Sequence, residues 1–301
     1  MRVLVVAVDL ETFVADQCNA VGKDGVHVFK FQINGHGIIG YAKSLWQLRK
    51  VINLCHPDLI HAHYGLSGLC ANLQRKVPVV TTYHGSDIHS GGWILKISQL
   101  AINLSAYNIF ISKKLKELSG THGNNVSILP CGIDIEKIHE IPRDEAKRKM
   151  NRQYPFVLFS GAFTNDVKNP SLAKEAMGKV PEAELLELKG YNRKEVNLLM
   201  NAADCLLMTS LREGSPQVVK EAMACGTPVV SVDVGDVKEI MGDTKGCFLV
   251  ERNADAIAEK IELALAFKGK TNGRQRIIEL GLSNDLVAKK LIGVYNEVLR
   301  K

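Results

Sequence analysis

Short apolar segments rich in valine and isoleucine alternate with amphipathic helical segments along nearly all of the 301 residues. This alternation is typical of α/β proteins with parallel sheets. The apolar segments lack a strict period of two, as expected for strands that are buried on both faces. In the first half, strands are expected at residues 3–8, 26–31, 58–61, 77–83, 108–111 and 126–129, and helices at 13–21, 44–54, 67–73 and 94–104.

One polar segment, residues 141–155 (IPRDEAKRKMNRQYP), interrupts this alternation. It is highly charged and bracketed by prolines, so we interpret it as a linker that carries a short helix. The 301 residues are enough for two domains, which we expect at residues 1–150 and 151–283. In the second domain, strands are expected at residues 156–160, 185–188, 205–209, 228–232 and 247–250, and helices at 193–202, 217–224 and 254–267.

The last segment, residues 284–301, is expected to form a separate helix over residues 285–299. Its large apolar side chains recur along one side of a helix, and this side should pack against another apolar surface. These side chains are Leu286, Leu291, Ile292, Tyr295 and Leu299.

The composition indicates a globular protein, with 46% hydrophobic and 23% charged residues. No segment approaches the roughly 20 consecutive apolar residues that a membrane-spanning helix needs. The first residues, MRVLVVAVDLETF, lack the longer apolar region and cleavage site of a secretory signal, so we expect a cytoplasmic protein. The seven cysteines are scattered without a CxxC pair, which argues against a disulfide framework or a zinc ribbon.

The net charge of +6 is concentrated in the first half of the chain. Residues 1–150 contain 17 basic and 12 acidic side chains, whereas residues 151–301 contain 21 and 20. The basic half could face an anionic acceptor or the inner surface of a membrane, or it could be ordinary solvated surface. Nucleic acid is not expected as a partner, because no basic run is interleaved with aromatic residues.

The segment 205–234 (CLLMTSLREGSPQVVKEAMACGTPVVSVDV) has the strongest functional signal. An apolar strand leads into a short loop, and a helix is expected to begin with Ser215 as its N-cap and Pro216 in its first turn. Such a helix N-terminus favours an anion such as a diphosphate. Glu213 precedes the helix and Glu221 lies inside it, and each carboxylate can accept two hydroxyl hydrogen bonds. An anion site flanked by two such carboxylates indicates a sugar nucleotide.

This segment resembles the E-x7-E signature of retaining glycosyltransferase family 4, which has the GT-B fold. Three further segments resemble the family in the same order: VPVVTTYHGSD (77–87), PCGID (130–134) and FVLFSGAFTNDVKN (156–169). The resemblance implies two Rossmann-like domains whose parallel sheets face each other across a cleft. It also implies a C-terminal helix that returns to the first domain.

The resemblance also implies roles for individual residues. Glu221 would bind the donor ribose, Glu213 and His84 would lie at the donor sugar as catalytic residues, and Lys168 would neutralise the diphosphate. No obligatory metal is implied. Each role has a structural alternative: a solvated helix start for the two glutamates, an exposed loop lysine, and a structural histidine. The remaining donor-binding positions implied are Gly161, Gly214, Ser215, Pro216, Gln217 and Val218.

The chain departs from the family in three places. The family arginine six residues before Lys168 is replaced by Ala162, and Arg212 is our hypothesis for a substitute. The first loop, residues 9–16 (DLETFVAD), contains no glycine. The region between residues 181 and 191 is short and lacks the Gly-x-Gly turn, so residues 189–191 are the candidate for a loop near the nucleobase.

Three other patterns are weaker. His61 and His63 lie two apart at a strand end and could hold a metal, but no acidic or cysteine partner has suitable spacing. Glu213 and Glu221 are poorly placed to act as a hydrolase pair, because one lies outside the helix and the other inside it. The glycine-rich segment 34–40 (NGHGIIG) lacks GxGxxG, and we interpret it as a loop near the acceptor.

The function expected from these observations is transfer of a hexosyl group from a UDP- or GDP-type donor to a hydroxyl of a glycan or lipid-linked acceptor. Synthesis of cell-surface polysaccharide or lipopolysaccharide is the expected setting, with peripheral contact to the membrane. Two alternatives stay open. Ala162 and the altered first loop would suit a protein that binds a sugar nucleotide without turning it over. A sugar-nucleotide epimerase of the same fold would need no acceptor.

Overall fold

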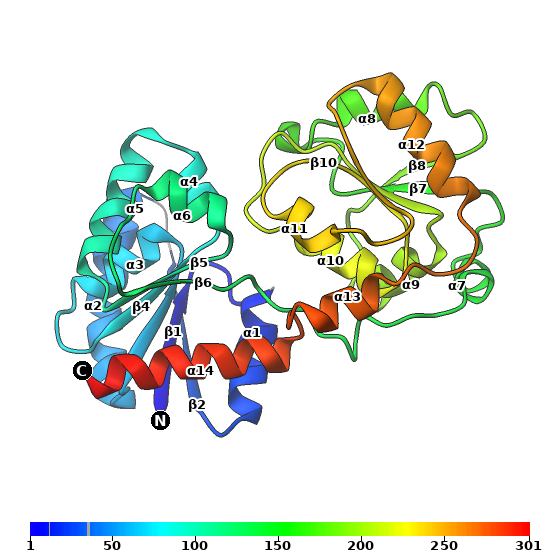
Figure 1. The fold of residues 1–301 in the computed structure, drawn as a ribbon. Helices are drawn as coiled ribbons and strands as arrows, with labels where there is room; N and C mark the ends of the chain where they lie inside the picture. The colour runs from blue at the N-terminus through cyan, green and yellow to red at the C-terminus, as the bar shows by residue number, and fades with distance from the viewer. Residues whose placement is uncertain (12, 35–36) are drawn as a thin grey trace. The chain divides into compact units, whose positions relative to one another are not determined.

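The computed structural model describes residues 1–11, 13–34 and 37–301. The chain divides into two compact units. Unit 1 comprises Met1–Gly132 together with Asn284–Lys301, and unit 2 comprises Ile133–Ser283. Each unit consists of a parallel sheet covered by helices, which confirms the expected α/β class with two Rossmann-like domains (Figure 1).

Unit 1 is built on a six-stranded sheet in the order β2-β1-β3-β4-β5-β6, and each neighbouring pair is parallel. The central strands β3 and β4 are completely buried, which explains why their sequences show no alternation. The strands are β1 (Arg2–Ala7), β2 (His27–Gln32), β3 (Leu59–His63), β4 (Val79–Tyr83), β5 (Tyr107–Phe110) and β6 (Val126–Ile128).

The helices of unit 1 cover both faces of this sheet (Figure 1). Helices α1 (Phe13–Lys23) and α14 (Asn284–Arg300) lie together on one face. The other face is covered by α2, α3, α5 and α6, because right-handed crossovers between β2 and β6 all place their helices on that side. These four helices are α2 (Gly37–Cys55), α3 (Gly65–Asn72), α5 (Gly92–Leu104) and α6 (Lys113–Ser119), and the short helix α4 (Ser86–His89) precedes α5.

The terminal helix α14 completes the hydrophobic core of unit 1. Leu291 and Tyr295 are buried, as expected, among side chains of α1, β1, β3 and β5. The predicted apolar face is wrong at its two ends, where Leu286 and Leu299 are exposed. Their places in the core are taken by smaller side chains, which let the helix pack closely on α1: Val287, Ala288 and Val298.

Unit 2 is built on a five-stranded parallel sheet in the order β11-β10-β9-β7-β8. Its strands are β7 (Phe156–Phe159), β8 (Glu184–Glu187), β9 (Cys205–Met208), β10 (Val229–Val232) and β11 (Cys247–Val250). Its helices are α7 (Arg143–Lys149), the 3-10 turn η1 (Asp166–Lys168), α8 (Pro170–Met177), α9 (Arg193–Ala202), α10 (Gln217–Ala224), α11 (Val237–Met241), α12 (Ala254–Ala266) and α13 (Gly273–Glu279).

The polar segment that was expected to end the first domain belongs to unit 2. Helix α7 packs against α9, and its Lys147 Nζ donates to both carboxylate oxygens of Asp204 at 2.8 and 3.0 Å. Arg143 lies 3.5 Å from the same carboxylate. Unit 1 therefore ends at Gly132 rather than at residue 150, since these ion pairs attach the charged segment to the second sheet.

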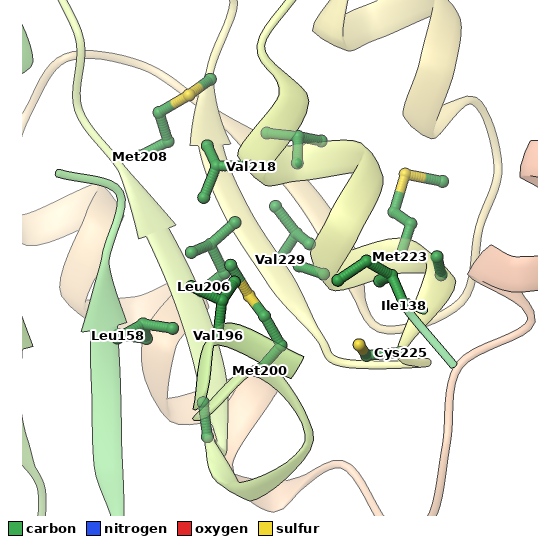
Figure 2. Close-up of a cluster of buried hydrophobic side chains, with 14 of the residues drawn as sticks. Ile138, Leu158, Val196, Met200, Leu206, Met208, Val218, Met223, Cys225 and Val229 are labelled. Atoms are coloured by element: carbon green, nitrogen blue, oxygen red, sulfur yellow. The ribbon is translucent and has the colours of Figure 1, made fainter. Parts of the chain in front are cut away.

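Helix α10, which follows the E-x7-E loop, is held by the larger hydrophobic core of unit 2. Figure 2 shows Val218 and Met223 of this helix among side chains from β9 and α9, including Leu206 and Val196. Every residue of α10 after Gln217 is buried. Burial on this scale fixes the helix, and with it the position of Glu221, relative to the edge of the sheet.

All seven cysteines are free, and five of them are buried. Among residues 1–11, 13–34 and 37–301, no helix combines the length and apolar character needed to cross a bilayer. The same described residues contain no group of three histidine, cysteine or acidic side chains arranged to hold a metal ion.

Candidate active site

The carboxyl edge of the unit 2 sheet brings together the segments that carry the E-x7-E motif and Lys168. Lys168 Nζ donates to Glu213 Oε1 at 2.7 Å, and both side chains are mostly buried. The hydroxyl of Thr209, at the end of β9, donates to the carbonyl oxygens of Lys168 and Asn169 at 2.9 Å each. These bonds attach the turn that contains Lys168 to the loop that contains Glu213.

Gly161 leaves room for the Lys168 side chain. It follows β7, and a Cβ atom at this position would lie 3.0 Å from Lys168 Cγ. Such a contact is tighter than ordinary van der Waals packing, so a larger residue would displace the lysine. The predicted pair of Gly161 and Lys168 is thus adjacent in the structure.

The N-terminus of α10 differs from the prediction. The helix begins at Gln217, its N-cap is Pro216, and no side chain caps it. The hydroxyl of Ser215 instead donates to Asp236 Oδ2 at 2.6 Å. Ser215 is not the N-cap because this carboxylate, which follows β10, takes up its hydroxyl. Gln217 and Val218 do open the helix, as expected from the sequence.

Two glycines bring the loop after β9 into contact with the loop after β10. A Cβ atom on Gly235 would lie 2.7 Å from the carbonyl oxygen of Gly214, and Gly235 has a φ of +60°. Only glycine fits a position that combines this conformation with such a close approach. The backbone of Gly214 is therefore supported from behind by the β10 loop.

Two charged residues lie buried beneath this loop, and the sequence analysis did not single them out. Lys220 is fully buried in α10, and Asp236 is nearly so. Burial raises the pKa of Asp236 to about 6, although the positive charge of Lys220 and the Ser215 hydrogen bond oppose this rise. No sequence signal distinguishes Lys220 from an ordinary helix lysine, because its burial depends on the packing of β10 beside β9.

Glu221 is buried and forms an ion pair with Arg193. Arg193 begins α9, whose N-terminus is fixed by a capping box between Asn192 and Glu195. It directly follows the 189–191 loop, in which Gly190 has a φ of +80°. The sequence analysis missed Arg193, because nothing in a single sequence couples it to Glu221.

Arg212, our hypothesis for a substitute of the missing family arginine, directly precedes Glu213 in the loop after β9. Arg212 is exposed. Lys168 pairs with Glu213, and Arg193 pairs with Glu221. Arg193 therefore also brings a positive charge to this edge of the sheet.

In unit 1, His84 follows β4 and contacts His63 at the end of β3. His63 Nδ1 lies 2.9 Å from His84 Nε2, and His84 Nδ1 lies 3.8 Å from the Cys131 sulfur. Burial lowers the pKa of His63 to about 3 and also lowers the pKa of His84. Both rings are therefore neutral at pH 7. The rings of Phe13 and Tyr64 lie 4.8 and 4.6 Å from that of His84.

Asp87 holds the backbone around His84. Its carboxylate accepts hydrogen bonds from the backbone N–H groups of Gly65, His84 and Gly85, at distances of 2.8–3.3 Å. Burial raises the pKa of Asp87 to about 6, and these N–H groups oppose the rise. The carboxylate thereby joins the turns after β3 and β4, where Tyr64 has a φ of +71°.

The two histidines once considered for a metal site have other partners. The rings of His61 and His63 lie side by side, 4.4 Å apart between centroids. His61 contacts the hydroxyls of Thr82 at 2.8 Å and of Tyr295 at 2.7 Å. Hydrogen bonding therefore accounts for His61, and it ties β3 to α14. The segments 9–16 and 34–40 are not loops throughout, because residues 13–16 begin α1 and residues 37–40 begin α2. Thr12, Gly35 and His36 lie outside the described residues.

Two family models match the chain. Residues 2–137 match Glycosyltransferase Family 4, and residues 185–281 match Glycosyl transferases group 1. A protein named as a teichuronic acid biosynthesis glycosyltransferase, TuaC of Bacillus subtilis, is 28% identical over 68% of this chain and 61% of its own length. An archaeal relative, the uncharacterised glycosyltransferase MJ1178 of Methanocaldococcus jannaschii, is 28% identical over 74% of this chain and 70% of its own. The chain thus aligns with less than two thirds of TuaC.

Solved structures resemble the whole chain. Sucrose-phosphate synthase from Thermosynechococcus elongatus has a TM-score of 0.88 and 17% identity, covering 100% of this chain and 99% of its own. Anabaena HepE, solved in complex with UDP, has a TM-score of 0.78 and 15% identity, covering 99% and 100%. At these identities the likeness shows the fold alone, and it confirms the expected GT-B class. With family models matching in both units and this fold, the chain belongs to glycosyltransferase family 4.

Proposed function

We propose that the chain transfers a hexosyl group, with retention of configuration, from a UDP- or GDP-type sugar donor to an acceptor hydroxyl. The observation that carries the proposal is the arrangement at the carboxyl edge of the unit 2 sheet. There Lys168 pairs with Glu213, and Glu221 pairs with Arg193, around the start of α10. Ligands of such sheets bind at this edge.

In this proposal, each group at the edge binds a different part of the donor. The Glu221 carboxylate accepts hydrogen bonds from the ribose hydroxyls, and Glu213 lies at the sugar. Lys168 exchanges its bond to Glu213 for the diphosphate and stabilises the negative charge that develops on the leaving group. The backbone from Gly214 to Val218 contacts the sugar and the diphosphate, as in the family it resembles.

His84 serves in binding the sugar rather than in proton transfer. Its low pKa keeps the ring neutral, and His63 occupies one ring nitrogen. The other nitrogen would exchange its weak contact with the Cys131 sulfur, at 3.8 Å, for the sugar. A neutral imidazole held in this way is suited to hydrogen bonding with a sugar hydroxyl. Rate enhancement would then come from positioning and from stabilising the leaving group.

The acceptor that we propose is a glycan or a lipid-linked glycan. TuaC is named for teichuronic acid biosynthesis, and another protein of similar fold is named as the lipopolysaccharide outer core galactosyltransferase WaaB, with a TM-score of 0.71. Cell-surface polysaccharide or lipopolysaccharide synthesis by a cytoplasmic enzyme at the inner face of the membrane fits such acceptors.

The test is calorimetric titration of UDP, GDP and their sugar conjugates into the wild type, Glu221→Gln and Glu259→Gln. Glu259 is an exposed glutamate on α12 that pairs with Lys260, so it controls for the substitution itself. We expect one nucleotide family to bind, with at least about tenfold weaker binding in Glu221→Gln and unchanged binding in the control. Equal binding by all three proteins would refute the ribose role of Glu221.

A second candidate that the fold permits is epimerisation of the donor sugar. The UDP-GlcNAc 2-epimerase of Methanocaldococcus jannaschii shares the fold with a TM-score of 0.66 at 13% identity. Incubating the protein with the donor alone distinguishes the two activities. Conversion of the donor to its epimer without acceptor would support the epimerase. Binding without turnover in either assay would support a non-catalytic binding protein.

A further inference from the structure

Both tryptophans of the chain are exposed on the layer of helices α2, α5 and α6, which covers one face of the unit 1 sheet. Trp46 on α2 is 59% exposed and Trp93 on α5 is 65% exposed. Tryptophan is a large apolar residue that is usually well buried, so two of two at the surface is unusual. The two helices cover the same face of the six-stranded sheet, on either side of α3 (Figure 1).

Further apolar and basic side chains accompany each tryptophan along its helix. On α2, Lys50 and Leu54 follow Trp46 at intervals of four residues and therefore lie on the same side. Leu54 is 80% exposed, and the Lys50 ammonium lies 3.4 Å from the centre of the Trp46 ring. On α5, Leu100 follows Trp93 at an interval of seven residues and is also exposed.

The charge of this layer is predominantly positive. Helices α2 and α5 contain no acidic residue, and α6, joined to α5 by a hydrogen bond from Gln99 to the Ser119 carbonyl, contains three lysines and one glutamate. The helices on the other face, α1 and α14, carry both signs. The basic side chains of the layer are Lys43, Arg49, Lys50, Lys96, Lys113, Lys114 and Lys116.

We propose that this layer, the exposed side of α2, α5 and α6, binds the surface of an anionic phospholipid bilayer. Exposed tryptophan and leucine side chains enter the interface between headgroups and acyl chains, while the lysines contact the phosphates. Two features favour lipid over a protein partner or a soluble glycan. The surface lacks acidic side chains along two whole helices, and its aromatic residues are tryptophans, which concentrate at membrane interfaces.

Tryptophan fluorescence tests this proposal directly, because both tryptophans of the chain lie in the layer. The full chain is mixed with vesicles of phosphatidylcholine, with or without about one third phosphatidylglycerol. We expect a blue-shifted emission and co-sedimentation with the anionic vesicles only. In Trp46→Phe and Trp93→Phe, the remaining tryptophan should still shift.

Two double variants and one control are compared. The first double variant combines Trp46→Ala and Trp93→Ala, the second combines Lys43→Gln and Lys50→Gln, and the control is Tyr154→Ala. Tyr154 is 82% exposed in unit 2 and serves as the control for loss of an exposed aromatic ring. We expect both double variants to bind vesicles roughly tenfold more weakly than the wild type, and the control to bind them equally well. UDP titration and thermal unfolding of each variant separate this effect from damage to the donor site or the fold.

Three outcomes would overturn the proposal. One is the absence of an emission shift and of co-sedimentation at any lipid concentration in the wild type. Another is equal binding by the wild type and both double variants. The third is a dimer in solution that the tryptophan substitutions dissociate, because the layer would then be an interface with a second copy of this chain.

Discussion

Lys168 Nζ lies 2.7 Å from Glu213 Oε1, so the lysine that was expected to bind the diphosphate is already paired with a glutamate of the E-x7-E motif. A diphosphate entering this site has to compete with that carboxylate for the ammonium group. In the proposed function, donor binding and the separation of this ion pair are therefore coupled.

The first prediction concerns this pair. Lys168→Ala should lower kcat/KM by about 10²-fold or more, because the leaving group loses its cation. Glu213→Gln should lower turnover as well, but it should tighten binding of free UDP, since Lys168 is released from its partner. Steady-state kinetics and UDP titration measure the two effects. Lys174→Ala, a lysine of α8 that lies over the Phe163 ring, is the control and should change neither.

Weaker UDP binding in Glu213→Gln would contradict this prediction. That result would mean that the carboxylate contacts the nucleotide instead of competing for Lys168.

A second prediction concerns Arg193 and Glu221. Arg193→Ala leaves the buried Glu221 carboxylate without this cation and should reduce the free energy of unfolding by about 1–2 kcal/mol. This cost is smaller than for a fully buried ion pair, because the arginine is half-exposed. In Arg193→Ala with Glu221→Gln, part of this loss should be recovered. Urea unfolding of both single variants and the double variant gives a coupling energy of about 1 kcal/mol.

The matched control for this cycle is the exposed pair of Lys179 and Asp255, whose nitrogen and oxygen atoms lie 2.6 Å apart. Its coupling energy should be much smaller than that of Arg193 and Glu221, because solvent screens both exposed charges. Additive effects of the Arg193 and Glu221 substitutions would show that their contact does not stabilise the native state.

A third prediction tests the glycine contact behind the donor loop. Gly235→Ala introduces a methyl group 2.7 Å from the Gly214 carbonyl oxygen, so the loop must move. We expect a loss of at least about 2 kcal/mol of stability and weaker UDP binding. Gly190→Ala is the control, because Gly190 also has a positive φ but a Cβ atom there meets nothing within 4 Å.

The control should cost only about 1 kcal/mol, which is the penalty for the backbone conformation. Thermal unfolding and UDP titration of both variants are compared. Equal losses of stability and of binding would assign the whole effect to φ and none to the contact.

The order of strands and helices could be predicted because Val- and Ile-rich runs and amphipathic runs are local signals. Helices α9 and α10 span the expected residues 193–202 and 217–224, although the N-cap of α10 is not the expected Ser215. The face of α14 was less predictable, since its burial depends on how closely α1 packs against it. Ser215 likewise has a local signal for an N-cap, and the carboxylate of Asp236, 21 residues away, overrides it.

In the candidate site, too, local sequence signals were predictable and contacts between distant residues were not. Lys168, Glu213 and Glu221 were predictable because the motif places them in a strand, loop and helix of known order. Arg193 was not, because its partner lies 28 residues away and only the folded sheet brings them together. The burial of Lys220 has the same origin.

A fourth prediction concerns acid. The folded pKa of His63 is about 3, below the ordinary value of 6.5, so the unfolded chain binds a proton that the native state rejects. His63 therefore contributes stability that is fully present above pH 6.5 and is lost as the pH falls toward 3. Between about pH 7 and pH 5, the loss from this residue should be about 2 kcal/mol.

Asp87 and Asp236 act with the opposite sign, because their raised pKa values favour the native state as the pH falls through about 6. The contribution of His63 is therefore measured as the difference in pH dependence between two proteins. Urea unfolding at both pH values is compared between the wild type and His63→Gln, in which the aspartates are unchanged. The same pH dependence in the two proteins would contradict a neutral, buried His63.

The core of unit 1 has a consequence for how the protein is made. Residues 1–132 leave the ribosome long before α14, whose Leu291 and Tyr295 complete that core. Unit 2 is continuous in sequence and can finish folding while unit 1 still exposes the apolar surface that α14 later covers. The first unit to be synthesised is thus completed after the second, and the nascent chain presents this surface to chaperones until α14 has been translated.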